Sequence, residues 1–366
     1  MPAVPRMSEV RAAEVARELY GVTAVAARLA SEHDDTFRLA LPDGSLRFLR
    51  ASAPDVAMAG TGQAGTTGHA GAGAAGASFL TAILLHLARS APGLPVQRVI
   101  PSLSGAAEVM VEDVAGAGAR LVRMTTFLPG RLLREVPSSA GLRRDVGATL
   151  ARLSLALRDF THPAARRTHH WDLQNASQLR PLLAELPGLA PGLRGRLAGA
   201  LDRFEAVVRP ALAGVPVQVI HTDFHGDNLL ASDDGSAVRG VLDFGDSLIG
   251  PVAQDVAVAA CYQLGADRDG GTDPLASALD VIAGYHAADP LRPADLPLIA
   301  DFIVLRLATR VIVSQWNAAR EPANSAYLLR RTPQAITQFD ALRAIPREAV
   351  IGRLRTAAGM NDASSE

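Results

Sequence analysis

The sequence predicts an α+β protein with two lobes: a small antiparallel β lobe over residues 1–128 and a large, mostly helical lobe over residues 129–360. Two observations support this prediction. Short β-type segments joined by turn residues dominate the first third of the chain, whereas apolar residues at helical spacing dominate the rest. At 366 residues, of which 48% are hydrophobic and 20% charged, the chain is also long for a single hydrophobic core.

The first lobe is predicted to begin with an amphipathic helix over residues 8–20, capped by Ser8. Five segments have the composition of short strands: 25–29, 36–41, 46–51, 108–114 and 120–127. The turn residues at 42–45 predict a hairpin. The Gly- and Ala-rich stretch 58–78 predicts a flexible loop, because such residues bury too little surface to become ordered. A second helix is expected to begin near Ser78, and residues 128–130 form the hinge between the lobes.

The second lobe is predicted to be helical on both sides of a β hairpin at 216–250. Residues 141–160 form one long helix, because their apolar side chains recur at the spacing of a buried helical face. Further helical segments are expected at 177–214 and at 251–343. The latter is interrupted at 289–294 and 321–324, where prolines occur.

The composition of the chain restricts its expected binding partners and its expected cellular compartment. The net charge of −1 gives no indication of a nucleic acid or an anionic membrane as partner. A single cysteine, Cys261, cannot form an internal disulfide and fits a reducing compartment. The N-terminus has no apolar signal core, and no apolar run reaches the length of a membrane span. We therefore expect a cytoplasmic protein without a membrane partner.

The hairpin contains the most informative residues of the chain. It carries the run HTDFHGDN at 221–228, and the run DFGD follows at 243–246. Phosphoryl transfer from a nucleotide requires a carboxylate that orients the attacking hydroxyl, and oxygen ligands that hold Mg²⁺. Protein kinases use an Asp, an Asn five residues later, and the Asp of a later DFG. The same order and spacing predict Asp223 as the catalytic residue and Asn228 and Asp243 as ligands of Mg²⁺.

Two other interpretations of the hairpin remain open. In the first, the Asp and Asn side chains are ordinary turn residues of a polar hairpin. In the second, His221, Asp223, His225 and Asp227 form a zinc site on one face of an extended strand. The Gly-Asp-Asn sequence at 226–228 favours a loop over a strand, and no second group of His or Cys residues with ligand spacing occurs in the sequence.

With these motifs the chain resembles the aminoglycoside phosphotransferase and choline kinase superfamily, which has a protein-kinase-like fold. Within that superfamily it is most similar to the hydroxylysine kinase branch. The resemblance extends from about residue 15 to about residue 340. Four further runs are shared with that branch: LVRMTTFLPGR at 121–131, DFTHP at 159–163, WDLQN at 171–175 and SQWNAAREPAN at 314–324.

The resemblance implies that ATP or GTP binds under the first lobe. Arg50 aligns with the strand lysine that contacts the phosphates in related kinases, and the hairpin tip with Ser31 and Thr36 lies over them. Arginine is bulkier than lysine but keeps its charge and grips phosphate, and this chain contains no lysine. The helix glutamate that normally pairs with this cation is not found, since the alignment places Ser78 near its position.

Other hairpin residues receive roles by the same resemblance. His221 braces the catalytic loop, and Thr222 stands where the family usually has glycine, which restricts the backbone. Asp246 contacts the second metal ion or a substrate amine, or caps the next turn. Asp255 braces the loop, faces an amine, or is a surface carboxylate.

An amino-acid substrate needs a cation for its carboxylate, and four residues are candidates for substrate contacts: Arg123, Trp171, Arg306 and Arg310. Packing or a surface position is the alternative for each of them. The resemblance implies a small-molecule kinase whose acceptor is the hydroxyl of an amine-bearing metabolite, with a hydroxylysine-like hydroxy-amino acid favoured. An aminoglycoside or antibiotic phosphotransferase and a non-catalytic nucleotide-binding module are the alternatives. The acceptor and the oligomeric state are not predicted.

Overall fold

The computed structural model describes residues 6–31, 34–52, 78–112, 118–186, 188–265 and 273–360. The chain divides into two compact units. Unit 1 comprises Met1–Gly130, His162–Ala165 and Arg239–Gly245, and unit 2 comprises Arg131–Thr161, Arg166–Val238 and Asp246–Glu366. Residues 162–165 and 239–245, which the sequence assigned to the helical lobe, therefore belong to unit 1. The predicted flexible loop at 58–78 lies, apart from Ser78, outside the described residues.

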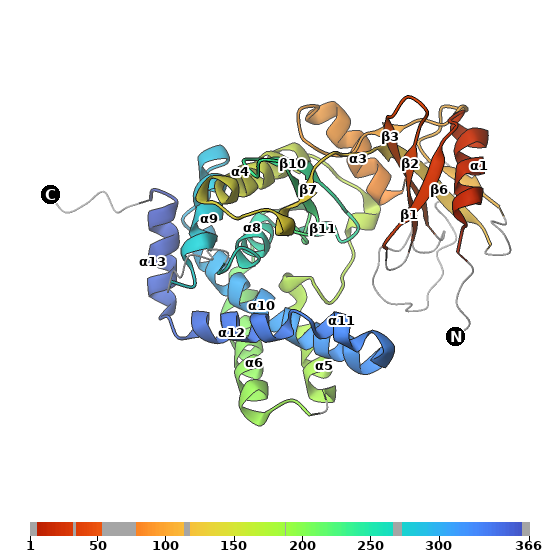
Figure 1. Ribbon diagram of the computed structural model, residues 1–366. Coiled ribbons are helices and arrows are strands. Elements are labelled where there is room, and N and C mark those ends of the chain that lie inside the picture. The colour runs from red at the N-terminus through yellow and green to blue at the C-terminus, as the bar shows by residue number, and fades with distance from the viewer. Residues whose placement is uncertain are drawn as a thin grey trace. The chain divides into compact units, whose positions relative to one another are not determined.

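Unit 1 is built on an antiparallel sheet (Figure 1). Its elements are α1 (Glu9–Tyr20), β1 (Val25–Leu29), β2 (Asp35–Ala40), β3 (Leu46–Ser52), α3 (Phe79–Ser90), β4 (Val99–Ile100), β5 (Val109–Val111), β6 (Arg120–Thr126) and the short 3-10 helix η2 (Pro163–Ala165). The strand order is β1-β2-β3-β6-β4, and β5 also pairs with β6. Every segment of this lobe that was predicted as a strand contains one, which confirms the predicted small β lobe.

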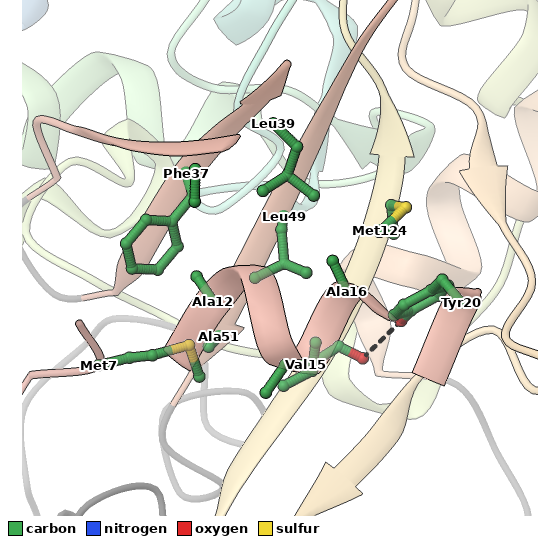
Figure 2. Close-up of a cluster of buried hydrophobic side chains, with 12 residues drawn as sticks. Met7, Ala12, Val15, Ala16, Tyr20, Phe37, Leu39, Leu49, Ala51 and Met124 are labelled. Atoms are coloured by element: carbon green, nitrogen blue, oxygen red, sulfur yellow. Dashed lines mark hydrogen bonds between the residues drawn. The ribbon is translucent and has the colours of Figure 1, made fainter. Parts of the chain in front are cut away.

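The core of unit 1 lies between α1 and the sheet. The Ser8 side chain caps α1 by accepting a hydrogen bond from the N–H of Arg11 at 3.1 Å. One face of α1 packs against Phe37, Leu49 and other buried side chains of the sheet (Figure 2). Each large apolar side chain buried in this way contributes about 1.5–3 kcal/mol to folding. This core supports β3, the strand that carries Arg50.

Unit 2 is mostly helical. Its elements are β7 (Arg131–Leu132), η1 (Leu133–Glu135), α4 (Ala140–Leu157), η3 (Leu173–Gln178), α5 (Leu179–Glu185), α6 (Pro191–Arg203), the π-helix η4 (Phe204–Val208), α7 (Arg209–Ala211), β8 (Val217–Ile220), β9 (Leu229–Ala231), β11 (Leu248–Pro251), α8 (Val252–Cys261), α9 (Ala276–Ala288), α10 (Asp295–Arg320), η5 (Pro322–Asn324), α11 (Ser325–Leu329), α12 (Thr332–Arg343) and α13 (Arg347–Ala357). The strand β10 (Val238–Val241) begins at the last residue of this segment of unit 2 and continues in unit 1.

Two helix pairs organise unit 2. Helices α4 and α9 approach closely at two glycines: a Cβ atom added to Gly284 would lie 1.9 Å from the main-chain oxygen of Arg144, and one added to Gly147 would lie 2.0 Å from that of Val281. Helix α8 is buried at residues 253–261 and packs against α10. Because β8 pairs with β11, which directly precedes α8, the run HTDFHGDN that follows β8 is joined to this buried helix.

None of the helices in the described residues is both long enough and apolar enough to cross a membrane. Helix α10, with 26 residues, is long enough in principle but carries Asp301, Arg306 and Arg310 among its buried residues. The side chain of Cys261 is buried in α8, and burial raises the pKa of its thiol.

Candidate active site

The predicted catalytic run forms the loop between β8 and β9, and α8 anchors that loop. The carboxylate of Asp255 accepts hydrogen bonds from the main-chain N–H groups of His221 (2.8 Å) and Thr222 (2.7 Å). Burial raises the pKa of the Asp255 carboxyl, and the charge of His221 and these hydrogen bonds act in the opposite direction. Of the roles that the sequence left open for Asp255, this position fits the brace. The ring of His221 is itself fully buried and lies edge-on to Phe224.

Two described non-glycine residues have a positive φ angle: Thr222 (65°) and Asp243 (51°). This left-handed backbone costs about 1–3 kcal/mol for a residue with a Cβ atom and needs support from its surroundings. The hydroxyl of Thr222 donates to the main-chain oxygen of Asp246 at 2.8 Å. The Oδ1 atom of Asp243 accepts from the N–H of Gly245 at 3.0 Å. Thr222 thus adopts the conformation that glycine favours, at the position where the sequence departs from glycine.

Asp223, the predicted catalytic residue, is surrounded by donors. Its Oδ2 atom lies 2.7 Å from Nδ2 of Asn228 and 3.1 Å from Nε2 of His225. Its Oδ1 atom lies 3.0 Å from Nη2 of Arg306. Burial acts to raise the pKa of Asp223, but the charges of His225, Arg306 and His221 outweigh burial and hold it well below its ordinary value. The side chain remains 24% exposed, so one edge of this ionised carboxylate stays accessible.

Arg306, for which the sequence left a substrate contact or a packed position open, is buried. Its guanidinium is 1% exposed, stacks over Trp171 at 4.7 Å, and pairs with Asp223. Arg310, about one helical turn later on α10, stacks over the ring of Tyr262 at 4.7 Å and donates to Gln338 at 3.5 Å. Arg306 and Arg310 therefore both lie against Tyr262, a residue that sequence reasoning missed, and Trp171 lies against Arg306.

Asp246 contacts neighbouring residues of unit 2 through its main-chain oxygen. Its carbonyl oxygen accepts from the hydroxyl of Thr222 and lies 3.0 Å from Nε2 of His169. Arg167 donates to the main-chain oxygen of the next residue, Ser247, at 2.8 Å. These contacts hold the turn before β11, and a role of the Asp246 side chain toward substrate or metal stays a prediction.

Asp227 is a second residue whose role was not predicted from the sequence, apart from its place in the alternative zinc site. Its carboxylate forms ion pairs with Arg134 and, at 2.8 Å, with Arg331. The main-chain N–H of Arg134 also donates to the carbonyl of Gly226 at 3.2 Å. Arg134 is about 90 residues before Asp227 in the chain, and Arg331 is about 100 residues after it. No local sequence pattern could therefore have predicted these two ion pairs, which hold the loop.

Asn228 belongs to unit 2 and Asp243 to unit 1. Nδ2 of Asn228 donates to Asp223, and the Asp243 side chain is 54% exposed. Both residues offer the hard oxygen atoms that Mg²⁺ prefers. Among the described residues, no group of three or more His, Cys, Asp or Glu side chains is arranged to hold a metal ion. The alternative zinc site therefore has no support from the structure.

Arg50, the predicted phosphate-binding cation, extends from β3. Its guanidinium forms an ion pair with Asp34, and its Nη1 atom lies 3.8 Å from Oδ1 of Asp243. Asp34 is 2% exposed and stands directly before β2, at the tip of the hairpin. The acidic partner of Arg50 is thus supplied by the hairpin tip and not by α3, where the sequence search for a glutamate found none.

Arg123 lies next to Arg50, because the two residues are register partners on β3 and β6. The guanidinium of Arg123 is 7% exposed, donates to the hydroxyl of Thr81 and lies 3.4 Å from Oε1 of Glu108. Burial lowers the pKa of Arg123 to about 10, the charge of Arg50 acts in the same direction, and Glu108 opposes both. The structure thus gives Arg123 partners within unit 1, where the sequence proposed substrate contacts in the large lobe.

Glu108 also caps α3. Its carboxylate accepts hydrogen bonds of 2.7 Å from both the N–H and the hydroxyl of Ser78, the position at which the sequence alignment expected the missing glutamate. A carboxylate at a helix N-terminus is stabilised by the unpaired N–H groups and by the helix dipole. The glutamate is thus present beside α3, but it comes from a separate segment and pairs with Arg123.

The hairpin tip was predicted to contact the nucleotide through Ser31 and Thr36. The hydroxyl of Ser31 accepts from the N–H of Asp34 at 3.4 Å, and the hydroxyl of Thr36 donates to the carbonyl of Leu29 at 3.3 Å. Residues 32 and 33 between them are outside the described residues. Both hydroxyls therefore stabilise the turn, and their contact with a nucleotide stays a prediction.

The sequence has relatives of known activity. A family model described as "Phosphotransferase enzyme family" matches residues 14–296. A hydroxylysine kinase from Danio rerio is 26% identical over 365 residues, which cover 95% of this chain and 93% of that protein. A homoserine kinase from Caulobacter sp. (strain K31) is 30% identical over 270 residues, which cover 70% of this chain and 74% of that protein.

Solved structures are similar over almost the whole chain. A microcompartment-associated aminopropanol kinase has a TM-score of 0.64 at 18% identity and covers 96% of this chain and 99% of its own. An amicoumacin kinase, solved in complex with AMP-PNP, Ca²⁺ and Ami, has a TM-score of 0.61 at 18% identity and covers 92% of this chain and 97% of its own. At these identities the likeness concerns the fold alone, and it confirms the predicted kinase-like α+β fold with two lobes.

Proposed function

Since this chain belongs to the phosphotransferase enzyme family, we propose that it transfers the γ-phosphoryl group of ATP or GTP to the hydroxyl of a hydroxylysine-like hydroxy-amino acid. The observation that carries the proposal is the ionised carboxylate of Asp223, held by donors on both oxygens and still partly exposed. A carboxylate in this state accepts a hydrogen bond from an acceptor hydroxyl and orients it for attack.

Each remaining requirement of phosphoryl transfer has a candidate residue. Asn228 and Asp243 would hold Mg²⁺, which neutralises the charge of the nucleotide phosphates when it is bound. The guanidinium of Arg50 would contact those phosphates, because it is 21% exposed and already binds carboxylates. Asp223 then receives the proton of the acceptor hydroxyl as the new O–P bond forms and the bond to the nucleotide breaks.

An amino-acid acceptor is supported by the relatives and by the residues near Asp223. The hydroxylysine kinases and the homoserine kinases are both named for hydroxy-amino acids. Such an acceptor needs a cation for its carboxylate, and Arg310, stacked on Tyr262 close to Arg306, is the candidate on α10. Trp171 offers an aromatic face beside the same group.

Purified protein tested with Mg²⁺ and either ATP or GTP against hydroxylysine, homoserine, aminopropanol and an aminoglycoside will test the proposal. We expect phosphorylation of a hydroxy-amino acid that is lost in Asp223→Asn and kept in Asp202→Asn, a control whose exposed carboxylate pairs only with Arg180 among the ion pairs described. Faster phosphorylation of the aminoglycoside would favour the antibiotic phosphotransferase alternative. Nucleotide binding without transfer to any acceptor would favour the non-catalytic module.

A further inference from the structure

Arg306 differs from the other candidate substrate residues because its charge is paired with the predicted catalytic residue. It lies in the middle of α10, is 1% exposed, and its Nη2 atom is 3.0 Å from Oδ1 of Asp223. A guanidinium buried against a carboxylate of the protein itself is poorly placed to bind the carboxylate of a substrate. Its contact with the predicted catalytic residue indicates a different role.

The guanidinium of Arg306 is held in place independently of Asp223. It stacks over the ring of Trp171 at 4.7 Å and lies 5.5 Å from the ring centre of Tyr262. It donates to the main-chain oxygen of Trp171 at 3.4 Å and to the hydroxyl of Tyr262 at 3.3 Å. Stacking and hydrogen bonds together restrict a planar guanidinium to one orientation. The loop residue Asp223 is therefore oriented by a fixed partner on a buried helix.

We propose that Arg306 is a positioning residue for phosphoryl transfer, whose guanidinium holds the Asp223 carboxylate in a single orientation toward the acceptor hydroxyl. The inference rests on the proposed function of Asp223. It assigns Arg306 no contact with substrate or nucleotide. It also explains why an arginine, which never loses its proton, is buried at this site.

Three side chains contact the Asp223 carboxylate. Asn228 and His225 lie in the same loop, at 2.7 Å and 3.1 Å from Oδ2, and Arg306 on α10 lies 3.0 Å from Oδ1. Of these three contacts, Arg306 comes from outside the loop, so it fixes the carboxylate relative to the buried helix.

This environment favours orientation of the hydroxyl over its early deprotonation. Three donors lower the basicity of the Asp223 carboxylate, which also makes it a poor base before the transition state. Phosphoryl transfer passes through a loose transition state in most analyses and gains most from positioning and electrostatics. A fixed, weakly basic carboxylate fits that requirement.

Two variants test the role of Arg306: Arg306→Met, which removes the charge at similar length, and Arg306→Lys, which keeps it without the planar fork. In Arg306→Met we expect kcat at neutral pH to fall about 100-fold, because misplaced catalytic groups cost about that much. The KM for the nucleotide should change less than about threefold. Because lysine at this position keeps the charge but not the planar fork that fixes the carboxylate, the kcat of Arg306→Lys should lie between those of Arg306→Met and the parent protein.

Arg143→Met is the matched control. Arg143 is 4% exposed and donates to Asp280 at 2.8 Å, so its loss also breaks a buried Arg–Asp pair in unit 2, between α4 and α9. It should lower the melting temperature and leave kcat within about threefold of the parent value at a temperature where both proteins are folded. An equal fall of kcat in Arg143→Met, or a parental kcat in Arg306→Met, overturns the proposal.

A second measurement does not depend on activity. In a crystal structure of Arg306→Met we expect the Asp223 carboxylate to leave the orientation that it has in the parent protein, while Trp171 and α10 stay in place. An unchanged Asp223 carboxylate overturns the role of Arg306. Absence of phosphoryl transfer to any acceptor by the parent protein, with Asp223 displaced in Arg306→Met as expected, overturns the proposed function alone.

Discussion

Arg50 in unit 1 and Arg306 in unit 2 both pair with an aspartate, but the two pairs differ in how firmly they are held. Arg50 is 21% exposed, extends from a strand and meets Asp34 at a hairpin tip. Arg306 is 1% exposed, lies on a buried helix and is stacked on Trp171. The partly exposed guanidinium of Arg50 can meet a further anion from the solvent, whereas the buried pair of Arg306 leaves an unpaired charge when it loses one partner.

The comparison separates two uses of arginine in a chain without lysine. Arg50 fits a cation that exchanges the carboxylate of Asp34 for a nucleotide phosphate. Arg306 fits a cation that keeps the same carboxylate throughout the reaction. If the two arginines differ in this way, variants around Arg50 and variants around Arg306 should change different kinetic constants.

The largest effect is expected for Asp223→Asn. The amide cannot receive the proton of the acceptor hydroxyl, so kcat should fall about 1,000-fold. The KM for the nucleotide should stay within a few-fold, because Asp223 acts on the acceptor. Steady-state kinetics with both substrates varied will measure this, and thermal unfolding will check that the unpaired Arg306 has not unfolded the variant. Turnover at the parental rate would remove Asp223 from the mechanism.

Asp243→Ala should lower kcat/KM about 100-fold and weaken Mg²⁺-dependent nucleotide binding. The triphosphate then loses an anionic anchor for its metal ion, and metal contacts contribute several kcal/mol. Calorimetric titration with the Mg²⁺–nucleotide complex, and with the nucleotide in excess EDTA, will separate the metal-dependent part. Normal affinity for the Mg²⁺ complex contradicts the assignment of Asp243 as a metal ligand.

Arg50→Ala should raise the nucleotide KM or lower kcat at least about tenfold, which is equivalent to roughly 1.4 kcal/mol and modest for a charge-assisted phosphate contact. Arg50→Lys keeps the charge at the position where related kinases have lysine and should retain activity. Parental kinetics in Arg50→Ala would mean that other groups hold the nucleotide.

The smallest effect is expected for Asp34→Asn. If the Asp34 carboxylate competes with phosphate for Arg50, its neutralisation should lower the nucleotide KM about two- to fivefold, the range of a partly exposed ion pair. Asp35→Asn is the matched control, because Asp35 pairs with Arg28 and accepts from the N–H of Met7, outside this pair. A higher KM in Asp34→Asn would show that Asp34 positions Arg50 and does not compete for it.

Local sequence patterns were sufficient for most of the fold. The capping serine and apolar face of α1, and the turn between β2 and β3, depend on residues within about one or two turns of each other. The order and spacing of Asp223, Asn228 and Asp243 were likewise enough to predict the family to which the chain belongs. Such signals are local because hydrogen bonds of helices and tight turns join residues close in sequence.

The environments of the charged residues were decided by tertiary structure. Asp223 and Arg306 are separated by 83 residues, and Ser78 and Glu108 by 30. Nothing in the sequence around Arg306 shows whether this arginine binds substrate or holds Asp223. An arginine in either role would have the spacing of a buried residue in a long helix. Only the packing of α10 beside the catalytic loop determines which carboxylate meets its charge, since ion pairs depend on distance in space and not on separation along the chain.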